Sequence, residues 1–138
     1  MENNVSKKND RIDNKLKYEL FPIESPAIEE IVKVYMAGEK KYGRNTWQGL
    51  QDGYNRYDGA QIRHDVEHKR GHIIDQETGA MHLAQVAWNA IAKLHCWLEE
   101  HGQVEVVEFE CPHCKSINYV ENLRNELNCW KCKNEIKL

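Results

Sequence analysis

The sequence predicts a mostly α-helical domain followed by a small β domain, and three observations support this fold class. Apolar residues repeat at helical spacing in three segments between positions 26 and 100. The β-branched stretch 104–109 alternates as a strand does. Two Cys-x-x-Cys pairs follow it. We therefore expect a helical domain over 15–102, a β domain over 103–138, and a polar, mobile tail over 1–14.

The composition is that of a globular protein. Of 138 residues, 41% are hydrophobic and 30% are charged, which is too apolar for wholesale disorder. A net charge of -3 argues against a strongly basic nucleic-acid surface. No apolar run approaches the roughly 20 residues of a membrane span, and the first residues lack the apolar core of a secretory signal. We expect a soluble cytoplasmic protein without a membrane partner, and nucleic acid is not an expected partner.

The first helix is expected from Pro26 to about Ala37. Ser25 is a favourable N-cap, and proline suits the first helical position. Gly38 is expected to stop or kink this helix. The preceding residues, 15–24, are apolar in patches and are expected to pack as an extended arm. Four apolar side chains repeat at helical spacing and define the buried face of the helix: Ile28, Ile31, Val32 and Tyr35.

A loop rich in glycine, cations and aromatic residues is expected next, up to residue 54. Lys40, Lys41 and Arg44 place three cations within five residues, and cations of this kind neutralise phosphate. Asn45 and Trp47 follow them, and a tryptophan ring can stack on a base. A solvated basic turn beside an anchoring tryptophan explains the same residues equally well.

Two further helices are expected, over about 55–69 and about 76–100, with Asp75 as the N-cap of the second of them. The apolar positions of 76–100 cover more than half of the helix circumference. Three helices of this size cannot cover such a surface by themselves. We therefore expect homo-oligomerisation to complete the helical core.

A group of histidines and acids forms a candidate metal site. His82 begins a polar line on an otherwise apolar helix, and His64, Asp75 and Glu77 can face it from nearby segments. Histidines and carboxylates on adjacent helices build divalent metal sites in helical bundles. Acids in a first helical turn are also favoured by capping and the helix dipole alone, and His64 can belong to a solvated face. The polar line consists of His82, Gln85, Asn89 and Lys93.

Four cysteines predict a structural zinc site in the β domain. Cys111 and Cys114 form one Cys-x-x-Cys pair, Cys129 and Cys132 form the other, and 14 residues separate the pairs. This spacing is typical of a tetrahedral, closed Zn²⁺ site. Two disulfides are the alternative, which is typical of secreted chains. With strands expected at 104–109 and 117–120, we expect the segment to be a zinc ribbon that is too small to build a core of its own, so that the metal supplies most of its folding energy.

The order of motifs from Lys15 to about Leu98 resembles one family. Leu20-Phe21-Pro22 follows the lysine, and Lys41-Tyr42-Gly43-Arg44-Asn45-Thr46-Trp47 stands where the pattern has a "KYG..NW" loop. Arg63-His64, the signature from Gly71 to Gln85, and Trp88-Asn89 come after it in order. These motifs resemble the N-terminal domain of phage and bacterial dATP/dGTP diphosphohydrolases, all-α relatives of the MazG-like nucleotide pyrophosphohydrolases. The chain departs from the pattern at His72, where the family has glutamate, and at Gln85, where it has histidine.

The resemblance implies a MazG-like bundle that cleaves a purine deoxynucleoside triphosphate into monophosphate and pyrophosphate, assisted by Mg²⁺ or Mn²⁺. Two alternatives stay open: a nucleotide-binding protein without turnover, and an adaptor for nucleic acid or protein built around the zinc ribbon. The implied roles divide into two sets. Metal ligands or water-orienting groups would be His64, Asp75, Glu77 and His82, and substrate contacts would be Lys41, Arg44, Asn45, Trp47 and Arg63.

Overall fold

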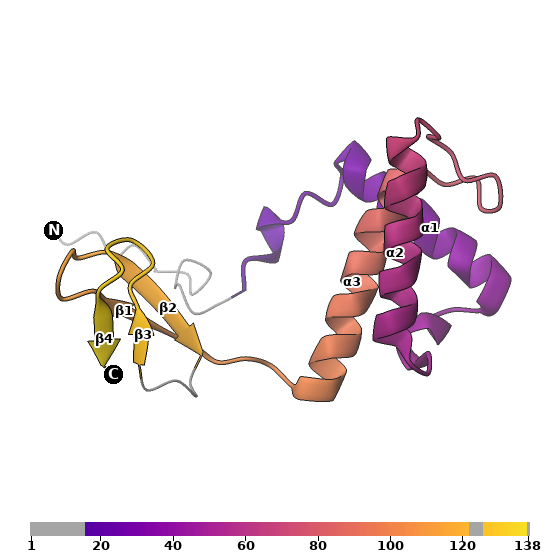
Figure 1. Ribbon diagram of the computed structural model, residues 1–138. Coiled ribbons are helices and arrows are strands. Elements are labelled where there is room, and N and C mark those ends of the chain that lie inside the picture. The colour runs from indigo at the N-terminus through magenta and orange to yellow at the C-terminus, as the bar shows by residue number, and fades with distance from the viewer. Residues whose placement is uncertain (1–15, 122–125, 138) are drawn as a thin grey trace, which may run out of the picture. The chain divides into compact units, whose positions relative to one another are not determined.

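The structure is a computed structural model that describes residues 16–121 and 126–137. The chain divides into two compact units, Met1–Cys96 and Trp97–Leu138. The tail expected over 1–14 lies outside the described residues. The first unit is helical, and the second contains four short strands (Figure 1). The predicted order, helices followed by a small β region with clustered cysteines, is confirmed.

The first unit contains α1 (Pro26–Tyr42), α2 (Gly53–Lys69) and most of α3 (His82–His101). Two short 3₁₀ turns, Tyr18–Leu20 and Thr46–Gly49, accompany them. In Figure 1, α2 and α3 lie side by side. Asp58 on α2 bonds Lys93 on α3, and the later His64 meets the earlier His82, so these two helices run antiparallel. None of the described helices is both long enough and apolar enough to cross a bilayer.

Helix α1 begins as predicted and ends later than predicted. The Ser25 side chain accepts a hydrogen bond from the Ile28 N–H at 3.3 Å, as an N-cap does. The expected end at Ala37 is wrong, because the helix continues through Gly38. A glycine inside a helix costs only about 1 kcal/mol, which neighbouring turns can outweigh. The helix ends at Gly43, whose φ of 92° suits glycine, and Lys41 therefore lies on the helix rather than on a loop.

Helix α3 begins six residues later than the sequence indicated, and Asp75 is not its N-cap. The backbone before it closes on itself: the Asp75 N–H donates to the Ala80 oxygen at 2.9 Å, and the Gly79 N–H donates back to the Asp75 oxygen at 2.8 Å. An isolated antiparallel bridge joins Ile74 to Met81. These bonds replace the first helical turn. They place Asp75 on a compact turn that leads into α3.

A small apolar core joins α1 to the start of α3. Val34, Ala80 and Ala84 are buried there, and Met81 and Trp88 pack against them. The arm predicted to pack does not do so against any of the residues that the structure describes. Its apolar side chains are 58% to 79% exposed, and they are Leu16, Tyr18, Leu20, Phe21 and Ile23.

The second unit holds two antiparallel strand pairs. Strand β1 (Val106–Glu110) pairs with β2 (Ile117–Glu121), and β3 (Glu126–Asn128) pairs with β4 (Glu135–Lys137). The first pair corresponds to the two predicted strands. The second pair was not predicted, because three-residue strands are too short to show an alternating pattern.

The turns that carry the cysteines have the same backbone pattern. The Lys115 N–H donates to the Cys111 oxygen at 2.9 Å, and the Lys133 N–H donates to the Cys129 oxygen at 3.0 Å. Both lysines have positive φ, 63° and 65°. Each turn folds its own Cys-x-x-Cys pair inward, so the arrangement of thiols within each pair depends on chain-local hydrogen bonds.

Candidate active site and cysteine cluster

A cavity of about 1180 Å³ lies within the helical unit. Its walls come from α1, the Thr46–Gly49 turn, α2, the turn around Asp75, and α3. Ligand cavities in proteins are commonly about 300 to 1,000 Å³, so this one has room for a nucleotide. The residues predicted to bind substrate, and all but one of those predicted to act on it, line the cavity: Lys41, Arg44, Asn45, Trp47, Arg63, His64, Asp75 and Glu77.

The predicted residue that does not line the cavity, His82, lies directly beside it. Its side chain is buried, and its Nδ1 is 2.9 Å from the Nδ1 of His64. With Asp75, these rings form a group whose three ligand atoms all lie within 4.8 Å of one another. Burial lowers the pKa of His64, which favours a neutral ring with a free lone pair. The fold thus brings together the side chains of His64 and His82, which are 18 residues apart in the sequence.

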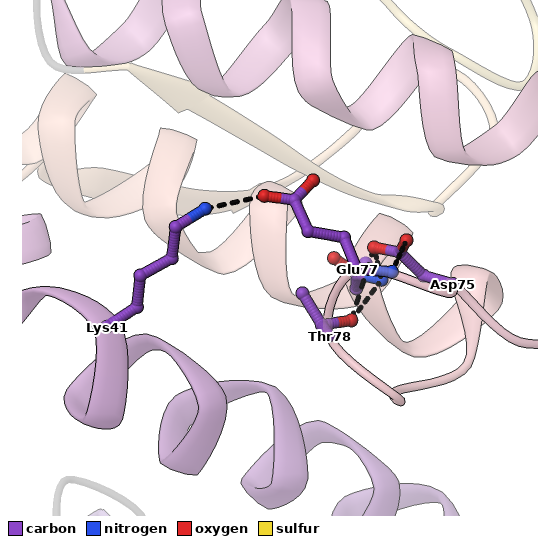
Figure 2. Close-up of polar contacts among 5 residues, drawn as sticks. Lys41, Asp75, Glu77 and Thr78 are labelled. Atoms are coloured by element: carbon purple, nitrogen blue, oxygen red, sulfur yellow. Dashed lines mark hydrogen bonds and ion pairs between the residues drawn. The ribbon is translucent and has the colours of Figure 1, made fainter.

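The carboxylate of Asp75 is held by three hydrogen bonds. Its Oδ1 accepts from the Glu77 N–H at 3.0 Å, and its Oδ2 accepts from the Thr78 hydroxyl at 3.2 Å (Figure 2). The Gln85 amide donates to the same Oδ2 at 2.9 Å. Burial favours the neutral acid, but these hydrogen bonds outweigh it and lower the pKa of Asp75. Asp75 is therefore a fixed, ionised carboxylate at the cavity wall.

Glu77 points away from this group and pairs with Lys41. The Lys41 Nζ and a Glu77 carboxylate oxygen are 2.5 Å apart, and Figure 2 shows the contact from α1 to the turn. The bond to Glu77, with a smaller contribution from Tyr42, raises the pKa of Lys41. Both side chains are largely exposed. The pair joins a candidate phosphate-binding cation to a candidate metal ligand. Among the described residues, neither side chain forms a hydrogen bond with His64 or His82.

Aromatic rings form another part of the cavity wall. Trp47 and Trp88 lie edge to face with centroids 5.9 Å apart, and Tyr35 meets both rings at 5.9 and 5.7 Å. The sequence predicted Tyr35 only on the buried face of a helix and named Trp88 in the Trp88-Asn89 motif, and neither ring was predicted to contact substrate. Asn45 lines the cavity as predicted, and its left-handed backbone (φ 60°) also gives it a structural role before the Thr46–Gly49 turn.

The two departures from the family pattern have distinct environments. Gln85 is buried and holds Asp75, so it orients the carboxylate. His72 is exposed and bonds Glu67 through its Nδ1 at 2.5 Å, outside the cavity lining. The polar line on the third helix was the signal that could have revealed the Gln85–Asp75 contact.

The four cysteines of the second unit form one cluster. The Sγ atoms of Cys111 and Cys132 are 3.8 Å apart, and those of Cys114 and Cys129 are 3.7 Å apart. Disulfide sulfurs lie about 2.05 Å apart, so these pairs are not bonded to each other. A tetrahedral Zn²⁺ with bonds of about 2.3 Å would separate its sulfurs by about 3.8 Å. The thiols therefore fit a closed zinc site.

Hydrogen bonds favour a thiolate in this cluster. Burial opposes ionisation of Cys129, but donors from Ser116, from the backbone of Cys132 and Lys131, and from Asn118 lower its pKa to about 5. Burial raises the pKa of the Cys111 thiol. The partners of Cys129 are suited to support a metal-bound thiolate.

Comparison with known proteins shows which family the helical part of the chain resembles. The sequence profile described as "dATP/dGTP diphosphohydrolase, N-terminal" matches residues 5–105. The chain belongs to this family. It is also similar to the "dATP/dGTP diphosphohydrolase" of Salmonella phage PMBT28, with 42% identity over 59 residues. That similarity covers 43% of this chain and 20% of the phage protein. No solved structure matches the chain. The family match ends before Cys111, so the cysteine cluster lies outside it.

Proposed function

We propose that this chain hydrolyses dATP and dGTP to the monophosphate and pyrophosphate. The observation that carries the proposal is a single cavity whose walls hold cations, aromatic rings and a fixed carboxylate. The family to which the chain belongs supports the same reaction. The phage relative bears the name of this activity, although the similar segment is a fifth of its length.

The cationic part of the cavity suits a triphosphate. Lys41, Arg44 and Arg63 line it, and their charges would neutralise phosphate oxygens. Lys41 is paired with Glu77, so a phosphate oxygen would replace that carboxylate at Nζ. The ion pair holds the ammonium group near the turn that carries Asp75, which lowers the ordering needed on binding.

The aromatic part suits a purine. Trp47 and Trp88 supply large rings and Asn45 supplies an amide, and all three residues line the cavity. A base would stack on one of these half-buried rings and exchange hydrogen bonds with the amide. These groups recognise a base and sugar, whereas the cations recognise the phosphates common to all nucleotides.

The reaction needs no covalent nucleophile. Water would attack the α-phosphorus, the bond to the oxygen bridging to the β-phosphate would break, and pyrophosphate would leave. A divalent ion, when bound, would neutralise phosphate charge and lower the pKa of its water. His64, Asp75 and His82 are the residues that could hold it, since their ligand atoms converge. Glu77 would orient water or substrate once released from Lys41.

The cysteine cluster would hold a structural zinc ion through Cys111, Cys114, Cys129 and Cys132. Their sulfur separations match tetrahedral Zn²⁺, and four thiolates leave no open coordination position. This ion would stabilise the second unit and take no part in hydrolysis. Elemental analysis should find one zinc per chain, and protein purified without chelators that lacks zinc would contradict the assignment.

We also propose that the helical unit self-associates, as MazG-like bundles do. Its described core is small, while several apolar side chains stay exposed on all three helices. A second copy would bury them. Light scattering should give a multiple of the 16.2 kDa chain mass, and a monomer at micromolar concentration would count against this. The exposed side chains are Val32, Met36, Ile62, Val66, Leu83, Ile91 and Leu94.

A substrate screen tests the proposed reaction. The protein is incubated with each dNTP and NTP in Mg²⁺ or Mn²⁺, and the products are separated by chromatography. We expect deoxypurine monophosphates and pyrophosphate. Triphosphates that bind but return unchanged would favour the nucleotide-binding alternative. A chain that neither binds nor cleaves any triphosphate would overturn the proposal.

A further inference from the structure

We propose that His64, Asp75 and His82 form a binding site for a first-row transition-metal ion that selects such ions over Mg²⁺. The binding of the ion does not depend on the proposed function, but its role in hydrolysis does. The site is built from other residues than the cysteine cluster, and the two differ in ligand type.

The geometry fits an ion held by both imidazoles. Bonds of about 2.1 Å at a right angle would separate two ligand nitrogens by about 3.0 Å. The two Nδ1 atoms are 2.9 Å apart, and an Asp75 oxygen lies within 4.8 Å of both. A hydrogen bond between two neutral rings gives a similar distance, so the experiment has to separate these cases.

The Asp75 carboxylate is oriented by hydrogen bonds that a simple histidine–aspartate pair would not need. In the described part of the chain, its hydrogen bonds come from Glu77, Thr78 and Gln85 rather than from either imidazole. Donors of this kind fix a metal-ligating carboxylate and leave its remaining lone pairs free. Asp75 is thus held by its own turn while the histidines face each other.

The ligand types decide which ion is selected. Mg²⁺ prefers oxygen ligands and keeps several waters, so two nitrogens are a poor set for it. Imidazole nitrogens suit Co²⁺, Ni²⁺ and Zn²⁺, with Mn²⁺ weaker. His64 and Asp75 line the cavity and His82 is buried beside them, so an ion held by all three would keep open positions on the cavity side. Those positions would be available to water or phosphate.

Cobalt binding tests the proposal on the full chain purified with zinc. We expect one additional Co²⁺ per chain by calorimetry, with a visible spectrum that lacks thiolate-to-cobalt charge transfer. A large excess of Mg²⁺ should leave it bound. His64→Gln keeps a hydrogen-bonding side chain and should weaken Co²⁺ by at least ~10-fold. The matched control is His72→Ala, an exposed histidine outside the group, and it should bind Co²⁺ like the parent.

The outcomes separate this site from the proposed reaction. No Co²⁺ beyond the cysteine cluster, or a folded His64→Gln protein with parental affinity, would overturn the site. Displacement of Co²⁺ by Mg²⁺ at comparable concentrations would overturn the selectivity. Binding of Co²⁺ without hydrolysis of any triphosphate would support the site while the proposed function fails. Hydrolysis in Mg²⁺ without Co²⁺ binding would leave the function and remove the site.

Discussion

The cysteine cluster and the His64–Asp75–His82 group each bring potential metal-ligand atoms close together, yet they are built in different ways. Cys111 and Cys129 are fully buried, and the four sulfurs all lie within 4.8 Å of one another. The histidine group offers three ligands, two of which line a large cavity. A filled coordination shell can only stabilise the fold, whereas an incomplete shell beside a cavity can also meet a substrate. The number of ligands and their access therefore distinguish a structural from a chemical site.

The two clusters also differ in what holds them. Each cysteine pair is shaped by hydrogen bonds within its own turn, such as the bond from Lys115 to Cys111. The histidine group depends on the packing of α2 against α3 and on the turn between them. Local bonds therefore set the geometry within each cysteine pair, whereas the meeting of the two pairs, like that of the two histidines, depends on contacts between distant residues.

Removal of a cysteine ligand should have the largest effect. Cys111→Ser leaves three ligands at a fully buried position, so we expect loss of zinc and unfolding of the second unit. The helical unit should be kept, because it is a compact unit that does not include the cysteine ligands. Zinc content and the dispersion of amide signals in NMR spectra measure the first effect, and far-ultraviolet circular dichroism measures the second. A zinc-free variant with an intact second unit would contradict the structural role of the cluster.

Asp75→Asn should have the next largest effect, on turnover of dATP and dGTP. The change keeps size but removes the charge fixed by Gln85 and Thr78, so we expect turnover to fall on the order of 100-fold.

Lys41→Ala should instead raise KM more than it lowers kcat, because phosphate charge is already present in the ground state.

Steady-state kinetics on both variants give the comparison, with circular dichroism as the control for folding. A folded Asp75→Asn protein with parental turnover would place the chemistry elsewhere in the cavity. Zinc content should stay at the parental value in both variants, since the cysteine cluster is independent of this site.

Gly53→Ala tests the dependence of the helical site on packing. A Cβ at Gly53 would lie 2.9 Å from the Cys96 sulfur, which is closer than such atoms approach. We expect the free energy of unfolding to fall by about 1 to 3 kcal/mol through overpacking. Cys96→Ala in the same chain should recover part of this loss, because it removes the sulfur.

Gly38→Ala is the matched control for that measurement. The space around Gly38 is open and its backbone is helical, so stability should rise by up to ~1 kcal/mol from helix propensity. Chemical denaturation followed at 222 nm measures all three variants. Equal effects of the two glycine substitutions would show that the α2–α3 contact does not limit stability.

Lys93→Met should have the smallest effect. Lys93 pairs with Asp58 across α2 and α3 at 2.6 Å, and Asp58 is substantially exposed, so water screens the pair. We expect a loss below about 1 kcal/mol, smaller in high salt. Denaturation at low and high ionic strength checks this. A large loss that persists in salt would mean that the ion pair, and not apolar packing, aligns the two helices.

The sequence alone determined the parts that depend on local chemistry. Cysteine spacing identified the cluster, because a Cys-x-x-Cys turn brings its two thiols together wherever it occurs. Ser25 and Pro26 fixed the start of α1 for the same reason, since capping involves only neighbouring residues. The order of motifs indicated the family, which the profile match over residues 5–105 confirmed.

Only the tertiary structure decided those features in which local hydrogen bonds compete with contacts to distant residues. Periodicity could not show that α1 continues through Gly38 or that the turn at Asp75 replaces the first turn of α3. At Asp75, one bond comes from Gln85, ten residues further on, and a pattern of apolar spacing carries no record of it. The meeting of His64 with His82 likewise required α2 and α3 to pack antiparallel. Residue types indicated the chemistry, but only the packing of distant segments brought those residues within contact distance.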